Sequence, residues 1–99
     1  MYLEDIEDFG LSPSDITDLD RIQKCLHVKT MDLSENGIIE IELLENLSYL
    51  EELNLSDNNI KNIDSISYLI NLKKLHFSNN DITDISSILE LKTLDYVDL

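Results

Sequence analysis

The sequence has few basic residues and a strong excess of acidic ones. Seven Lys and Arg residues stand against 21 Asp and Glu residues, which gives a formal net charge of −14. A surface of this charge repels the phosphates of nucleic acids and anionic lipid, so we expect no direct binding to either. It favours a protein partner that presents a basic surface.

Other absences bear on where the protein works. The single cysteine, Cys25, excludes an internal disulfide. No stretch approaches the roughly 18 apolar residues that a membrane-spanning helix needs. The first ten residues, MYLEDIEDFG, are acidic and lack the apolar segment of a secretory signal. We therefore predict a cytoplasmic protein.

A repeat of 22 residues runs through the chain, and its apolar residues, part of a hydrophobic content of 42%, fall into columns. The columns hold Val28, Leu50, Leu72 and Leu94; Met31, Leu53, Leu75 and Val97; Leu33, Leu55, Phe77 and Leu99; Ile38, Ile60 and Ile82; Ile41, Ile63 and Ile85; Leu44, Ile66 and Ile88; and Cys25, Leu47, Leu69 and Leu91. We predict a single domain over residues 1–99, with repeats near 6–27, 28–49, 50–71 and 72–93 and a partial repeat at 94–99.

Each repeat contains two kinds of periodicity. Alternating stretches such as ELNLS predict short half-buried strands, which we expect near 8–11, 30–33, 52–55, 74–77 and 96–98. After each strand, apolar residues recur three positions apart, a spacing typical of 3₁₀ or short helical turns. One repeat cannot bury its apolar side alone, so we expect stacked repeats to share a continuous core.

An asparagine follows the strand in three repeats, at Asn36, Asn58 and Asn80, while the first repeat has Ser14 there. An amide side chain both donates and accepts hydrogen bonds, so it can bridge the backbone of neighbouring turns. We interpret this column as structural. The next column, Asp15, Gly37, Asn59 and Asp81, holds residues that tolerate left-handed or turn geometry.

These residues carry a resemblance to a known family. The pattern L-x-x-L-x-L-x-x-N-x-I is met at Leu50, Leu53, Leu55, Asn58 and Ile60, and 22 residues later with Phe77 in place of one Leu. It is similar to the 22-residue SDS22-like leucine-rich repeat, which internalins also contain. The resemblance implies an α/β leucine-rich-repeat solenoid with a short parallel β-sheet on its concave face and 3₁₀ or short helical turns on its convex face. It also implies a binding module without naming a ligand.

Strand side chains alternate between the core and the concave face, which predicts the outward residues. We expect a protein-binding patch that mixes charge, amide and aromatic groups, as recognition surfaces do. Its predicted members are Asp32, Glu52, Asn54, Lys74, His76, Tyr96 and Asp98. The alternative is a solvated face whose charges only keep the protein soluble.

Enzymatic and metal-dependent functions fit the sequence less well. His76, Ser78 and Asp98 are the residue types of a nucleophilic triad, but Ser78 lies two residues from His76 on one strand, without an oxyanion site or a cover. Acidic side chains could gather around calcium, but no calcium-loop motif is present; these are Asp32, Glu35, Glu52 and Asp57. We therefore predict a protein that is not an enzyme and uses no metal or cofactor.

The sequence leaves the biological role open between two kinds of binding protein. The first is a noncatalytic protein–protein interaction module, a scaffold or regulatory subunit, as the resemblance implies. The second is a small acidic inhibitor that occupies a basic nucleic-acid-binding channel of another protein, as some phage-encoded anti-CRISPR proteins do. The sequence stops within a fifth strand, near 96–98, which leaves three interpretations open. The chain is a fragment of a longer protein, the last strand is itself a minimal cap, or its open edge pairs with a second copy or with a target.

Overall fold

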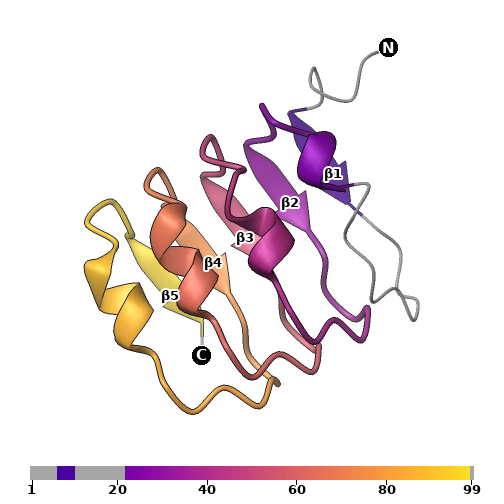
Figure 1. The fold of residues 1–99 in the computed structure, drawn as a ribbon, viewed down its shortest axis with the longest axis vertical. Helices are drawn as coiled ribbons and strands as arrows, with labels where there is room; N and C mark the ends of the chain where they lie inside the picture. Colours follow the sequence, from indigo (N-terminus) through magenta and orange to yellow (C-terminus); the bar gives the residue numbers. More distant parts are fainter. Residues whose placement is uncertain (1–6, 11–21, 99) are drawn as a thin grey trace.

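The computed structural model describes residues 7–10 and 22–98. Within these residues five parallel strands form one sheet in chain order (Figure 1): β1 (Asp8–Gly10), β2 (Thr30–Asp32), β3 (Glu52–Asn54), β4 (Lys74–His76) and β5 (Tyr96–Asp98). Each begins where the sequence predicts a strand, and β2 to β4 end one residue earlier than expected. The predicted solenoid with a short parallel sheet is therefore confirmed.

The register of the sheet follows the 22-residue repeat. Glu52 of β3 pairs with Thr30 of β2 and with Lys74 of β4, so residues 22 positions apart lie side by side. The same register holds at β1 and at β5. Each column that falls on the strands is therefore a row of neighbouring side chains across the sheet.

Short 3₁₀ segments form the second layer, on one face of the sheet (Figure 1). They are η2 (Ile22–Lys24), η3 (Glu42–Leu44), η4 (Asp64–Tyr68) and η5 (Ser86–Glu90). No helix in the described residues is long and apolar enough to cross a membrane. The apolar spacing of three has thus produced the tight turns that it predicts.

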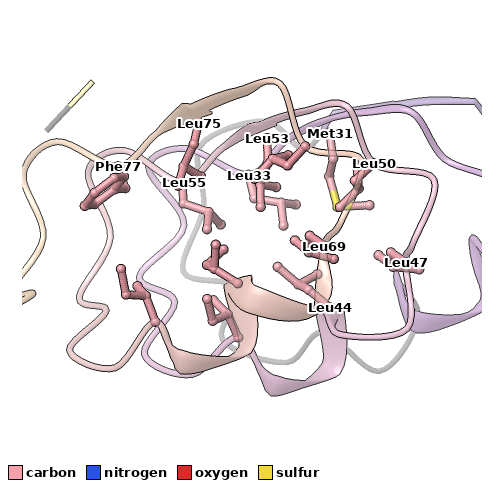
Figure 2. Packing of buried hydrophobic residues seen from close by; sticks show 14 of the residues in the cluster. Met31, Leu33, Leu44, Leu47, Leu50, Leu53, Leu55, Leu69, Leu75 and Phe77 are labelled. Carbon is pink, nitrogen blue, oxygen red and sulfur yellow. The ribbon is translucent and has the colours of Figure 1, made fainter. Parts of the chain in front are cut away.

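The core lies between these two layers. Figure 2 shows inward side chains of the strand segments, such as Leu53 and Leu75, opposite Leu44 and Leu69 of the second layer. Cys25 is 1% exposed and packs in the same cluster, as predicted for its column. The apolar columns are therefore the core of the solenoid.

One column member departs from this pattern more than the partly buried Ile82, Leu94 and Val97 do. Ile85 shares its column with Ile41 and Ile63, which are buried, yet Ile85 is 42% exposed. In a solenoid each side chain is covered by the repeats on either side. Within the described residues no later repeat covers Ile85, so the expectation that its column is buried throughout is wrong at this position.

The asparagine column bridges consecutive repeats. The Asn58 side-chain oxygen accepts the backbone N–H groups of Asn36 (3.0 Å) and Ile38 (2.9 Å) from the preceding turn. Its side-chain nitrogen donates to the carbonyls of Leu33 (3.0 Å) and Leu55 (2.9 Å), which belong to two different repeats. Asn58 thus satisfies buried backbone groups on both sides of one inter-repeat boundary.

Asn80 repeats this arrangement one turn later. Its side-chain oxygen accepts the N–H of Ile60, and its nitrogen donates to the carbonyls of Leu55 and Phe77. Every buried side-chain nitrogen and oxygen in the described residues has a hydrogen-bond partner. The bridging role predicted for the asparagines is therefore observed at Asn58 and Asn80, while Ser14 lies outside the described residues.

The left-handed backbone falls mainly two positions earlier than the sequence suggests. Positive φ angles occur at Glu35 (59°), Asp57 (59°) and Asn79 (57°), directly before each asparagine. In the column after the asparagine, among described residues, only Gly37 has a positive φ, at 68°. The sharp reversal out of the strand therefore precedes the bridging amide, which then stabilises the turn.

Replacing Asn58 by alanine tests the bridge. The Asn58→Ala variant leaves buried N–H and C=O groups of two repeats without partners. Because each unsatisfied buried group costs about 1–3 kcal/mol, we expect the free energy of unfolding to fall by about 3 kcal/mol or more. Urea denaturation followed by circular dichroism measures this change.

The neighbouring Asn59 is exposed, and no side-chain hydrogen bond of it is observed in the described residues, so Asn59→Ala is the matched control. We expect that variant to stay within about 0.5 kcal/mol of the parent chain. Equal losses in the two variants would contradict the bridge as the source of the stability.

Candidate functional site

All of the predicted site residues lie on the outward face of the sheet. One ladder brings together Glu52, Lys74 and Tyr96, and the ladder beside it brings together Asp32, Asn54, His76 and Asp98. Each of these side chains is half-buried or exposed, whereas the residues between them on the strands are buried or half-buried. The alternation of the strands has thus gathered the seven residues on one surface.

His76 is the centre of the contacts on this face. Its Nε2 atom lies 3.8 Å from Glu52 Oε1, and its Nδ1 atom lies 3.8 Å from Asp98 Oδ2. Glu52 comes from β3 and Asp98 from β5, so the imidazole of β4 lies between two carboxylates. Its side chain is 27% exposed, and both of its nitrogens face acidic groups.

Tyr96 packs beside this imidazole. The two ring centroids are 5.3 Å apart and the ring planes are tilted by 48°. Tyr96 nevertheless remains 51% exposed, so one part of its ring is available to solvent. A large side chain that is both held in place and exposed is well suited to binding, because little conformational freedom is lost when a ligand covers it.

Lys74 does not neutralise the face. It lies between Glu52 and Tyr96 in the ladder, but among the described residues it forms no ion pair. The one lysine–carboxylate pair observed there, Lys73 with Glu51 at 3.3 Å, lies just before the strands. In the described residues no lysine is therefore paired with a carboxylate of the site.

Asp32 and Asn54 take part in the turns at the strand ends. Asp32 Oδ1 accepts hydrogen bonds from the N–H (3.0 Å) and the hydroxyl (2.7 Å) of Ser34. Asn54 Oδ1 likewise accepts the N–H of Ser56. One oxygen of each side chain is thus engaged locally, which leaves the other carboxylate oxygen of Asp32 and the amide nitrogen of Asn54 for a partner.

Several side chains that were considered for catalysis or metal binding make other contacts in the structure. The Ser78 hydroxyl donates to the hydroxyl of Ser56, while the nitrogens of His76 face carboxylates. Asp57 accepts a hydrogen bond from Asn79 at the strand exit. In the part of the chain that the structure describes, no group of three or more His, Cys, Asp or Glu side chains is placed to hold a metal ion.

Two ionisable groups away from the sheet face have shifted pKa values. Burial raises the pKa of the Cys25 thiol, which makes the thiolate scarce and the side chain poorly reactive. Hydrogen bonds from the hydroxyl and N–H of Ser86 hold the pKa of Asp84 below its usual value. Neither group adjoins the seven site residues in sequence.

A second set of exposed side chains was not anticipated from the sequence. Large apolar side chains are exposed where the chain returns from the 3₁₀ layer to the strands, and they are Leu26, Tyr49, Tyr68 and Ile70. The Tyr49 ring packs edge-on against His27, with centroids 5.2 Å apart. Leu26 and Ile70 occupy the same position in two repeats, outside the core columns. Apolar residues at a position that does not belong to the core were the sequence signal for this exposure.

The comparisons with known proteins agree with this geometry. The leucine-rich-repeat family model matches residues 46–63 and 68–85, two segments that begin 22 residues apart. No curated protein sequence matches the chain. The two matched repeats and the solenoid fold make this chain a leucine-rich-repeat protein.

Solved structures with a similar fold include two bacterial proteins. Internalin C2 of Listeria monocytogenes superposes over 97% of this chain with a TM-score of 0.78 and 22% identity. A leucine-rich-repeat protein of Leptospira interrogans matches 86% of the chain, with a TM-score of 0.77 and 28% identity. The chain spans 52% of the first of these proteins and 22% of the second.

The hydrogen bonds of Asp32 predict separate effects for two substitutions. Asp32→Ala removes the acceptor for Ser34 and should lower the free energy of unfolding by about 1 kcal/mol. Asp32→Asn keeps an oxygen in the place that Asn54 occupies one repeat later, so its stability should stay near that of the parent chain. Thermal unfolding of the two variants measures the difference, and equal destabilisation would rule out the turn as the cause.

Proposed function

We propose that this chain is a noncatalytic protein–protein interaction module that binds its partner through the concave face of the sheet. Leucine-rich-repeat proteins are in general interaction modules of this kind. The observation that carries the proposal is the division of each repeat into two sets of positions. Most of the apolar residues that recur between repeats are buried, whereas the residues of the outward ladders differ from repeat to repeat.

The centre of the proposed surface is the contact between His76 and Tyr96. The ring of His76 on β4 packs against the ring of Tyr96 on β5, and Glu52, Lys74 and Asp98 are their neighbours on the same face. Aromatic residues surrounded by polar groups are typical of the few positions that contribute most of the binding energy in protein interfaces. These five residues therefore form the proposed centre, with Asn54 and Asp32 extending it along the sheet.

The charge of the face indicates the kind of partner. Among the seven site residues, Asp32, Glu52 and Asp98 are acidic and only Lys74 and His76 are basic, on a chain whose net charge is −14. Complementary charge directs encounter and selects against acidic partners. We infer a protein partner whose contact surface is basic, such as a protein that itself binds nucleic acid or the target of a scaffold or regulatory subunit.

Alanine substitutions at the centre test this function. Tyr96→Ala and His76→Ala should each weaken binding by about 5- to 30-fold, the usual effect of truncating a central interface residue. The partner is first captured from a lysate of the source cell by the parent chain and identified by mass spectrometry. Affinities of the variants for the purified partner are then measured by calorimetry.

Tyr68 is the matched control, because it is also an exposed tyrosine but lies at the end of η4. We expect Tyr68→Ala to bind as the parent chain does, and all three variants to remain folded by circular dichroism. If Tyr96→Ala and His76→Ala bind normally while Tyr68→Ala does not, the partner uses a different surface and the proposal is wrong.

Salt distinguishes the two roles that remain open. An acidic inhibitor that fills a basic channel should lose affinity steeply as ionic strength rises, because its binding depends on many exposed charges. A scaffold or regulatory subunit anchored by Tyr96 should depend on salt much less. Affinities for the captured partner between about 0.05 and 0.5 M salt measure the slope; a shallow slope would contradict the inhibitor role.

A further inference from the structure

We propose that Glu52, His76, Tyr96 and Asp98 form a seat for one cationic side chain of the partner, an arginine or a lysine, and that this cation competes with the proton of His76. The inference rests on the proposed function of the concave face and specifies its partner. It concerns a single position on that face rather than the overall acidity of the chain.

The two carboxylates are placed to receive a cation. Glu52 and Asp98 reach toward the same imidazole from strands on either side of it, each at 3.8 Å. Their side chains are each 46% exposed, so a group from a partner can reach them. Among the described residues His76 is their only ionic partner, and Lys74 pairs with neither. When His76 is neutral, the seat therefore holds two negative charges and no positive one.

Tyr96 supplies the remaining wall of the seat. Its ring lies against His76 and is about half exposed, beside the carboxylate of Asp98 two residues later. A cation attracted by Asp98 can therefore pack against the exposed part of this ring, where the ring quadrupole favours positive charge. A guanidinium suits this arrangement best, because it is flat and can bond a carboxylate while it stacks.

The proton of His76 opposes this cation. An imidazole changes its charge between about pH 5 and 8, a range in which carboxyl groups ordinarily remain ionised. The neighbours of the imidazole on the adjacent strands are Glu52 and Asn54 from β3 and Asp98 and Tyr96 from β5. Lys74 and Ser78 lie two residues before and after His76 in its own segment of the chain. A protonated His76 neutralises part of the charge of Glu52 and Asp98 and repels a second cation.

The affinity for the cation should therefore fall as the pH is lowered. Because a unit charge a few ångströms away acts with at least about 1 kcal/mol even in water, which is a factor of about five, we expect at least a fivefold weaker affinity at pH 5.5 than at pH 8. This direction is opposite to that of a site at which protonated histidine itself attracts an acidic partner.

The test uses a blocked glycine–arginine–glycine tripeptide and the full chain labelled with ¹⁵N. At pH 8 the tripeptide should cause saturable shifts in the amide resonances of residues 52, 76, 96 and 98. The same peptide with citrulline, which has the shape of arginine without its charge, should cause almost none. At pH 5.5 the affinity should be at least fivefold weaker.

Two histidine variants isolate the source of the pH dependence. His76→Gln removes the titrating group and should bind the arginine peptide equally at the two pH values. His27→Gln, which changes the histidine beside Tyr49, should keep the parent behaviour. The double variant with Glu52→Gln and Asp98→Asn should lose binding at pH 8 while it remains folded, since both side chains are exposed.

Three results would overturn the inference. They are shifts spread evenly over all acidic residues, equal binding of the citrulline peptide, and equal affinity of the parent chain at both pH values. Its failure can be told from failure of the proposed function. If the captured partner still loses affinity with Tyr96→Ala, the concave face binds protein and only the cation seat is wrong.

Discussion

The fold depends on hydrogen bonds that satisfy the buried backbone N–H and C=O groups at the point where the chain leaves each strand. Three-residue strands contribute few hydrogen bonds of their own, and the following turn buries further N–H and C=O groups. The amide of Asn58 satisfies groups from two repeats at once, and Asn80 does the same at the next boundary. The same side chain thus stabilises its own turn and fixes the neighbouring repeat at a spacing of 22 residues.

This constraint divides every repeat into positions that maintain the stack and positions that are free to vary. The inward columns must match in size to fill a continuous core, and the asparagine must be kept at each boundary. The outward ladders carry no such requirement, except where Asp32 and Asn54 also close a turn. Variation therefore accumulates on one face, in register, and brings His76 between Glu52 and Asp98 although 46 residues separate the two carboxylates in the chain.

The repeat made most of the architecture predictable from sequence. Its period gave the strands, their parallel order, the core columns and the position of the seven site residues on one face. Burial of Ile85 was mispredicted because exposure depends on the neighbouring repeats and not on the column. The left-handed residues were placed two positions late, because Glu35 gives no sequence signal for positive φ. The contacts of His76 and the packing of Tyr49 against His27 depend on side-chain conformation, so the columns of the sequence could not predict them.

The central claim is that repeated positions hold the fold and differing positions on the concave face bind the partner. A scan of all single substitutions, read once for the amount of folded protein and once for binding of the captured partner, tests it most directly. The account predicts that substitutions in the core and asparagine columns reduce both signals. Substitutions at Glu52, His76, Tyr96 and Asp98 should reduce binding alone. A set of binding-only positions centred on Tyr49, Tyr68 and Ile70 would contradict the account.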